Sequence, residues 1–357
     1  MLGISVGAAA SSPATPHSLI ILRRTKVIGG IVARLSKAEL LAKILDGVRT
    51  GGWLPLVIDG THPFLIRAVH PDGKSFDFRV YIWNCTHGGT NRADDEFRIQ
   101  FTSVVPHEDE GAPTLLLGWH DELEVFAAWD ISAHDGQNSA SPSAQIRERT
   151  LEAAAGGAFA TQAKENEIVV AFRPFLLIDY AQSTRSLHRM GAAYRDISLL
   201  NDLDSLDDEL IGSVSDRPRQ MVIRRIARRY RAASFSGKVL SAYGHRCAFC
   251  RVQLGLLDAA HIVPVSVPGS TDEITNGVAL CKLHHFAYDS NLVAFDRHYV
   301  IHVSESRVGE LADAELDGGL RRFRNALLPE LLLPANARNW PNTAYVQTAL
   351  RVRGWRP

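Results

Sequence analysis

The stretch from Cys247 to Asp289 constrains this chain more than any other part, because it gathers three of the four cysteines at metal-ligand spacing. Two residues lie between the first two cysteines, and two lie between the third cysteine and a histidine. Ligand pairs with this gap converge on one tetrahedral zinc ion, each pair from its own turn. The alternative is that the cysteines are small buried residues and the histidine lies on the surface. The sequence predicts a structural zinc ion with the ligands Cys247, Cys250, Cys281 and His284.

A second set of polar residues is interleaved with these pairs. His261 precedes Asn276 by fifteen positions, and Asn276 precedes His285 by nine. With these residues and the runs around them, the segment from about Ser236 to Ile301 resembles the HNH nuclease family. The core of that family is two short strands and a helix around one catalytic metal ion. The resemblance covers less than a fifth of the chain.

The resemblance implies a role for each member of this second set. It makes His261 the general base, Asn276 the residue that holds the ring of that histidine, and His285 a ligand of the catalytic metal. Asp289 follows His285 by four residues, which is one helical turn, so the two side chains can share one ion. A mixed nitrogen and oxygen site of this kind favours magnesium or manganese.

Phosphodiester hydrolysis requires these residue types whatever the family. A water molecule must lose a proton near neutral pH, and an imidazole with an unperturbed pKa of about 6.5 can accept it. A divalent cation must offset the charge that builds on the phosphate and on the leaving 3′ oxygen. One imidazole and one carboxylate can hold such a cation and leave positions open for substrate.

The chain departs from the family at the position before the general base. Many HNH enzymes have a metal-binding aspartate there, and this chain has Ala260. The nearest carboxylate, Asp258, would point to the opposite face from His261 in a regular strand. A β-bulge would redirect Asp258 and make it a third ligand of the catalytic ion. Otherwise the ion uses only His285, Asp289, water and the phosphate, and Asp258 is a solvated carboxylate.

An arginine-rich segment precedes the nuclease segment. Residues 217–231 hold seven arginines and no acid, and they follow an acidic stretch from Asp202 to Asp216. A helix with one apolar stripe would leave most of these arginines on its other faces. Such a surface can neutralise the phosphates of double-stranded DNA, or it can pair with the acidic stretch. The predicted stripe is Met221, Val222, Ile226 and Tyr230, and the predicted DNA-binding residues are Arg224, Arg225, Arg228 and Arg229.

The first 190 residues predict a separate β-rich module. Ser36 and Glu39 fit a capping box at the start of a helix. Alternating apolar residues and apolar runs between residues 76 and 172 predict at least five strands, and the module has at least two helices. The predicted fold class is α+β, with this module followed by a zinc-braced ββα-metal nuclease domain. Modular nucleases commonly join such a domain to an amino-terminal reader of a DNA sequence or a modified base, and this arrangement is similar.

These patterns give the predicted domain boundaries. A helical extension at the end of the chain would pack on the nuclease core or form a homodimer, because a double-strand cut by a single-site enzyme generally needs two active sites. The predicted parts are a disordered start (1–30), a DNA-recognition module (31–190), an acidic linker (191–216), the nuclease domain with its basic entry helix (217–305) and the extension (306–357).

Composition agrees with a soluble cytoplasmic enzyme. With 357 residues, 46% of them hydrophobic, the chain can bury a sizeable core. The cysteines lie mostly in a metal-spaced set, which favours a reducing compartment over a disulfide scaffold. No run of eighteen apolar residues predicts a membrane span, and residues 1–20 lack the basic start of a secretory signal.

The sequence thus predicts a metal-dependent DNA endonuclease of a restriction or host-defence system, including the modification-dependent kind. One alternative is a non-catalytic, zinc-stabilised nucleic-acid-binding protein, which would have no use for His261, Asn276, His285 and Asp289. Another is a mobile-element or homing HNH nuclease, whose front module would recognise a long asymmetric site. The sequence does not decide among these kinds of protein.

Overall fold

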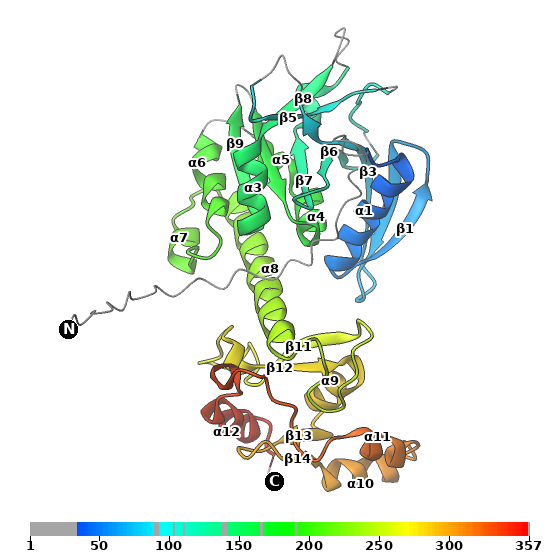
Figure 1. Ribbon diagram of the computed structural model, residues 1–357, viewed down its shortest axis with the longest axis vertical. Coiled ribbons are helices and arrows are strands. Elements are labelled where there is room, and N and C mark those ends of the chain that lie inside the picture. The colour runs from blue at the N-terminus through cyan, green and yellow to red at the C-terminus, as the bar shows by residue number, and fades with distance from the viewer. Residues whose placement is uncertain are drawn as a thin grey trace, which may run out of the picture.

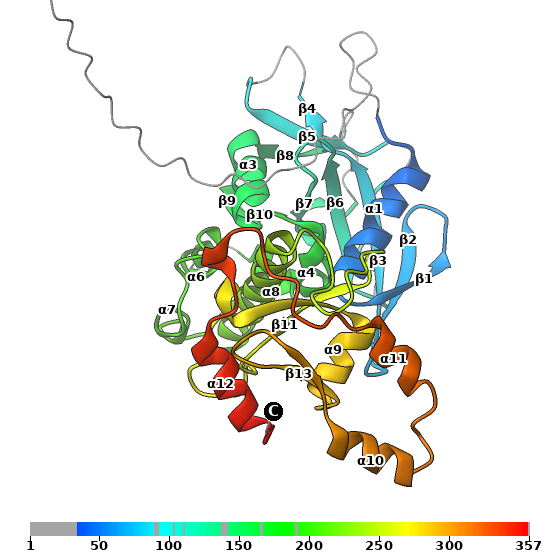
Figure 2. The same ribbon diagram turned by 60° about the horizontal axis from the view of Figure 1, so that its bottom comes forward.

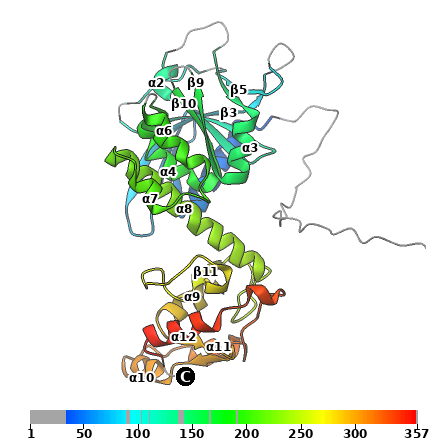
Figure 3. The ribbon, with the colours of Figure 1, turned by 90° about the vertical axis from the view of Figure 1, so that its left-hand side faces the viewer.

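Two packed units joined by one long helix make up the part of the chain that the structure describes. The computed structural model describes residues 34–88, 93–102, 104–109, 111–136, 142–164, 167–189 and 192–355. The predicted disordered start, residues 1–30, lies outside these ranges. The joining helix is α8 (Arg217–Ala242), which runs between the units in Figures 1 and 3.

A seven-stranded mixed sheet is the centre of the amino-terminal unit. Its strands are β1 (Leu54–Asp59), β2 (Phe64–Val69), β3 (Ser75–Asn84), β6 (Thr114–His120), β7 (Val125–Trp129), β9 (Phe159–Lys164) and β10 (Glu167–Phe172). They lie in the order β1-β2-β3-β6-β7-β10-β9. Only β3 and β6 pair in parallel, and all other neighbours are antiparallel.

Each face of this sheet has its own apolar core, as the period of two along a strand requires. On β3, Phe78, Val80 and Ile82 belong to one core, while Tyr81 and Trp83 belong to the other. The second core is closed by a three-stranded sheet and one helix: β4 (Thr86–His87), β5 (Glu96–Gln100), β8 (Ser143–Arg147) and α3 (Glu148–Gly157). This β-rich mixed architecture confirms the predicted α+β class.

Helices cover the other face of the sheet. The first of them, α1 (Lys37–Thr50), opens with the predicted capping box, in which the Ser36 side chain accepts from the Glu39 N–H. Losing such a cap costs about 1 kcal/mol. The remaining short elements of the unit are α2 (Ile131–His134), η1 (Pro174–Leu176), α4 (Leu177–Ala181) and α5 (Thr184–His188).

The segment predicted as an acidic linker packs on this unit instead. Residues 192–216 form α6 (Ala192–Ile197), η2 (Ser198–Asn201) and α7 (Asp208–Gly212). Ile197, Leu200 and Ile211 are fully buried in the core below the sheet. The linker prediction was wrong because the acids of this segment alternate with apolar residues, and these apolar residues cover one face of the sheet.

Helix α8 is shared by both units. Val222, Ile223, Ile226 and Ala227 complete the amino-terminal core, and Phe235 and Val239 lie in the carboxy-terminal one. Met221, predicted to belong to the apolar stripe, is 60% exposed, and Ile223 takes its place. At 1.5 Å per residue, the 26 residues of α8 span about 39 Å. Within the described residues, no helix combines the length and the apolar character needed to cross a membrane.

The carboxy-terminal unit is built around a small hairpin. Strands β11 (Leu257–His261) and β12 (Gly277–Cys281) pair in antiparallel register, and α9 (Lys282–Asp289) follows directly. A Cβ on Gly277 would lie 2.3 Å from Val239, so only glycine lets α8 approach this hairpin. The other elements are η3 (Ile274–Asn276), β13 (Val293–Phe295), β14 (Ile301–Val303), α10 (Glu305–Asp313), α11 (Leu320–Ala326), η4 (Ala337–Asn339) and α12 (Thr343–Val352).

The last fifty residues complete this second core. Leu331, Val346 and Ala349 are buried in it together with Phe249 and Leu280. Figure 2 shows α12 on one side of the β11–β12 hairpin and α9, and α11 on the other. The packing agrees with one of the two predictions for this segment, namely that it docks on the nuclease core.

Candidate active site and metal sites

The two cysteine-containing pairs meet at one point of the carboxy-terminal unit. Cys247, Cys250, Cys281 and His284 each offer a ligand atom, and these atoms lie within 4.8 Å of one another. The Cys250 and Cys281 sulfurs are 3.9 Å apart, and His284 Nδ1 is 3.5 Å from the Cys247 sulfur. A tetrahedral ion with metal–sulfur bonds of 2.3 Å would separate its sulfurs by about 3.8 Å. The donor set therefore fits a four-coordinate metal ion.

The electrostatics of the three thiols also suits a cation. Burial raises the pKa of Cys247, but hydrogen bonds from His284 and the Cys281 and Phe249 backbone outweigh it and lower the pKa to about 6. Burial and the Cys247 charge raise the pKa of Cys250 to about 12, and burial raises that of Cys281. Three thiolates at this spacing repel one another, and a bound divalent ion removes that repulsion.

His285, in the first turn of α9, lies between a carboxylate of β11 and a carboxylate at the end of α9. Its Nδ1 is 3.1 Å from Asp258 Oδ2, and its Nε2 is 3.3 Å from Asp289 Oδ2. Lys282 also binds Asp258, at 2.6 Å from Oδ1. The hydrogen bond with His285 and the ammonium of Lys282 lower the pKa of Asp258 despite its partial burial. Asp289 is the more open of the two carboxylates, with 56% of its side chain exposed.

Asp258 contacts His285 without the β-bulge that was predicted to redirect it toward the catalytic ion. The pairing of β11 with β12 is regular from Leu257 to His261. Asp258 does point to the opposite face from His261, as predicted, and α9 lies across that face. In this arrangement the two carboxylates contact different nitrogens of the His285 ring. The donor set fits an ion at Nε2 with Asp289, while Asp258 accepts from Nδ1–H and fixes the tautomer.

His261 stands on the α8 side of the hairpin. Its ring stacks on Phe235, with centroids 3.9 Å apart and planes 14° from parallel. Its Nε2 is 2.9 Å from Asp272 Oδ1, in the loop between β11 and β12. The side chain is 18% exposed. The ring is therefore held in its plane by Phe235 and in its rotation by Asp272, and Nδ1 is the nitrogen left for chemistry.

Asn276 acts on the loop rather than on the ring of His261. Its Oδ1 accepts from the Val263 N–H at 2.9 Å, and its Nδ2 donates to the Thr271 carbonyl at 2.8 Å. The Asn276 side chain is fully buried. The resemblance implied a direct contact with His261, whereas these bonds tie the loop ends that place Asp272 beside His261. The positioning of the imidazole is therefore indirect.

The two imidazoles flank one strand. His261 contacts α8 from one face of β11, and Asp258 brings His285 of α9 to the other face. The sheet holds two strands in the part of the chain that the structure describes, and there the outer edge of β11 has no strand partner. A phosphate at that edge can be approached from both faces, because side chains of both faces flank it.

Only part of the predicted cationic surface is free on α8. Arg225 and Arg229 both pair with Asp179 of α4, at 3.6 Å and 3.2 Å. Asp179 is 4% exposed, and a carboxylate so buried needs cationic partners. Arg224 and Arg228 are exposed, about 100° further round the helix. Arg225 and Arg229 therefore hold α8 to the amino-terminal unit, and DNA binding by the four arginines stays a prediction.

Sequence reasoning missed Asp272 and Phe235. Asp272 lies in a polar loop, eleven residues after His261, where no periodicity links it to a histidine. Phe235 lies on a helix 26 residues before His261 and looks like an ordinary core aromatic. The one signal available was that a general base needs a partner that orients it.

Two family models match separate parts of the chain. Residues 247–296 match the model described as HNH endonuclease, and residues 76–181 match the one described as Methylase-associated X1. Comparison with curated proteins gives no match. Among solved structures, the chain is similar to a "Modification dependent TagI restriction endonuclease", with 13% identity, 76% of this chain and 80% of that chain covered, and a TM-score of 0.27. At that TM-score, the likeness carries no argument about fold or function.

The family match and the geometry agree on the same residues. The hairpin and helix that carry His261, Asn276 and His285 lie inside the matched range. Residues 247–296 of this chain are an HNH endonuclease domain, the catalytic domain of a phosphodiester-hydrolysing nuclease.

Proposed function

We propose that this protein is a metal-dependent DNA endonuclease of the restriction type, in which the amino-terminal unit decides which DNA is cut. The observation that carries the proposal is the arrangement at β11. An oriented imidazole lies on one face of an open edge strand, and an imidazole with a carboxylate at metal-ligand distance lies on the other. A protein that only binds DNA would need neither.

His261 is the general base in this proposal. Asp272 accepts a hydrogen bond from Nε2–H, which leaves Nδ1 to take the proton of the attacking water. Phe235 keeps the ring from turning away. Asn276 keeps the loop with Asp272 in place. General base catalysis of this kind contributes about 10² to 10⁴ in rate.

His285 and Asp289 would hold the catalytic ion. Their nitrogen and oxygen donors suit magnesium or manganese, and such an ion offsets charge on the phosphate and the leaving 3′ oxygen. Asp258 orients His285 by accepting from Nδ1–H. The exposure of Asp289 leaves this side of the site open to solvent and substrate.

Zinc is the ion proposed for the Cys247, Cys250, Cys281 and His284 cluster. Three thiolates and one imidazole in a tetrahedral arrangement select zinc over magnesium. The cluster is closed by four protein ligands, so its role is structural. It fixes the start of α9, and with it the position of His285.

The amino-terminal unit is proposed to read double-stranded DNA, with a preference for modified bases. The support is the match of residues 76–181 to a module named for its association with methylases. The exposed Arg224 and Arg228 would contact phosphates between this unit and the nuclease domain. A homodimer would supply the two active sites that a double-strand cut needs.

Plasmid cleavage tests the catalytic part of the proposal. Purified protein with magnesium or manganese should nick or linearise DNA, and His261→Ala should lower the rate at least about 100-fold. DNA binding and zinc content should stay unchanged in that variant. The exposed histidine variant His298→Ala is the matched control and should cleave normally. Equal cleavage by His261→Ala would refute the mechanism.

A second experiment separates target choice from cleavage. Plasmids that are plain, methylated, hydroxymethylated or phosphorothioated are offered in parallel to the wild-type protein. Faster cutting of one modified substrate would support the reader assignment. Equal cutting of all four would refute the modification preference and leave the nuclease assignment intact.

A further inference from the structure

One arginine from the end of the chain reaches the proposed metal site. Arg353 is the C-cap residue of α12 and lies 64 positions after Asp289. Its Nη1 donates to the Tyr288 carbonyl at 2.8 Å, and its Nη2 is 3.5 Å from Asp289 Oδ1. Only 9% of the side chain is exposed. The end of the chain therefore contacts α9 where α9 carries its last proposed ligand.

Asp289 is held at both oxygens by this arrangement. Its Oδ2 faces His285 Nε2 at 3.3 Å, while Oδ1 faces the guanidinium of Arg353. The guanidinium carbon also lies 4.2 Å from the centroid of the Tyr288 ring. A planar guanidinium fixed on a ring and a carbonyl has little freedom left, so it gives the carboxylate a defined orientation.

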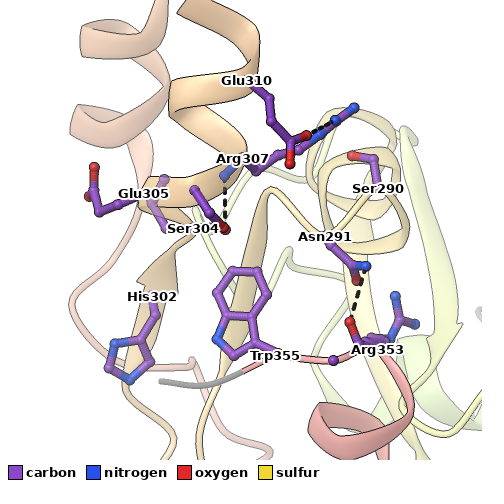
Figure 4. Close-up of a pocket in the computed structure, with 12 residues that line it drawn as sticks. Ser290, Asn291, His302, Ser304, Glu305, Arg307, Glu310, Arg353 and Trp355 are labelled. Carbon is purple, nitrogen blue, oxygen red and sulfur yellow. Dashed lines mark hydrogen bonds and ion pairs between the residues drawn. The ribbon is translucent and has the colours of Figure 1, made fainter.

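The backbone around Arg353 is itself anchored. Asn291 Nδ2 donates to the Arg353 carbonyl at 3.4 Å, as Figure 4 shows beside Trp355. These residues line a cavity of about 700 Å³. Among the described residues, Arg353 Nε and Asn291 Oδ1 are buried without a hydrogen-bond partner. Burying a guanidinium with an unsatisfied N–H costs stability, so stability alone is a poor reason for an arginine here.

We propose that Arg353 is a positioning residue of the nuclease site, which turns Asp289 so that only Oδ2 is presented to the ion beside His285. This inference rests on the proposed role of Asp289 as a ligand. Without Arg353, a side chain that is 56% exposed would be free to rotate away from His285. The HNH family match ends at residue 296, so this chain completes its site with a residue outside the matched domain.

Manganese binding to the full-length protein tests the inference directly. Electron paramagnetic resonance gives the dissociation constant of Mn²⁺ for wild type, Arg353→Gln and Arg353→Lys. Arg353→Gln should bind Mn²⁺ about 10- to 100-fold more weakly than wild type, the loss that is typical when a residue bonded to a metal ligand is replaced. Arg353→Lys keeps the positive charge but loses the planar guanidinium with its fixed N–H donors. The Mn²⁺ affinity of Arg353→Lys should therefore lie between that of wild type and that of Arg353→Gln. Arg351→Gln, an exposed arginine two positions earlier, is the matched control and should bind as wild type does.

A double-mutant comparison shows whether Arg353 acts through Asp289. Asp289→Asn with Arg353→Gln should bind Mn²⁺ no more weakly than Asp289→Asn alone. Additive losses, or an Arg353→Gln variant that melts earlier but binds Mn²⁺ normally, would overturn the inference. If wild type binds Mn²⁺ but cuts no DNA, the proposed function fails while the effect of Arg353 on binding still decides this inference. A wild type that binds no Mn²⁺ overturns both.

Discussion

Carboxylates orient both imidazoles of the nuclease site. Asp272 fixes His261 at 2.9 Å, and Asp258 fixes His285 at 3.1 Å. In each case one ring nitrogen is occupied by the carboxylate, and the other nitrogen is left for proton transfer or for a metal. The roles of the two histidines therefore follow from their partners as much as from their own chemistry.

Asp272→Asn tests the orientation of the general base. The variant keeps the shape of the side chain but loses the charge that favours a proton on Nε2. We expect the cleavage rate at saturating DNA and Mn²⁺ to fall, by at most the roughly 10²- to 10⁴-fold that general base catalysis contributes, with Mn²⁺ affinity and DNA binding unchanged. Single-turnover cleavage measures the rate, and Glu273→Gln in the same loop is the control. A fall in DNA affinity with an unchanged rate would contradict this role for Asp272.

At the scale of elements, α8 divides its arginines between two tasks. Arg225 and Arg229 neutralise the buried Asp179, and Arg224 and Arg228 lie exposed. A buried carboxylate that loses its partners is left uncompensated, which costs several kcal/mol in general. An exposed arginine contributes little to folding but can release counterions from DNA.

This division predicts opposite outcomes for neighbouring variants. Arg224→Ala with Arg228→Ala should weaken DNA binding and flatten its dependence on salt, with thermal stability unchanged. Arg225→Ala with Arg229→Ala should lower the melting temperature of the protein instead. Fluorescence anisotropy at several salt concentrations and calorimetry measure the two effects. The assignment fails if the first pair of variants changes stability but not binding.

The zinc cluster gives a second prediction at this scale. Cys247→Ser removes a thiolate ligand and should abolish stoichiometric zinc binding, because the remaining ligands hold the ion weakly. The carboxy-terminal unit should then lose its cooperative unfolding, and DNA cleavage with it. Cys85→Ala, at a buried cysteine of the other unit, should retain the zinc. Elemental analysis of folded wild type that finds no zinc would refute the assignment.

At the scale of the whole molecule, α8 is one helix that packs into the cores of both units. Its first half completes the core under the large sheet, and its second half carries Phe235 against His261. A motion of the amino-terminal unit that carries α8 with it would therefore move Phe235, which stacks on the proposed general base. In the proposed enzyme, this helix links recognition to cleavage.

A proline between the two cores tests this continuity. Ala232 is exposed on α8, and Ala232→Pro removes one helical hydrogen bond and kinks the helix at a cost of about 3 kcal/mol. We expect the two units to unfold in separate calorimetric transitions and cleavage to fall, while zinc content is retained. Ala232→Gly, which costs about 1 kcal/mol, should behave nearly as wild type. Identical behaviour of both variants would show that the helix is not the link.

The sequence alone determined the local chemistry of this protein. Ligand spacing predicted the Cys247, Cys250, Cys281 and His284 cluster, because zinc imposes its geometry on short turns. The capping box at Ser36 and the period-two pattern on β3 likewise depend only on neighbours along the chain. The resemblance placed His261, Asn276 and His285 in one domain.

Tertiary packing decided everything that depends on contacts between distant residues. Asp258 contacts His285 without a β-bulge, because α9 packs on the face of β11 that carries Asp258. The packing of α8 on α4 pairs Arg225 and Arg229 with Asp179. The acidic stretch packs on the sheet because the apolar residues between its acids cover one face of the sheet. Asp272 and Arg353 joined the site through a loop and a chain end, where no periodicity marks a residue. Such partners are fixed by the free energy of the packed whole, which spacing along a chain does not encode.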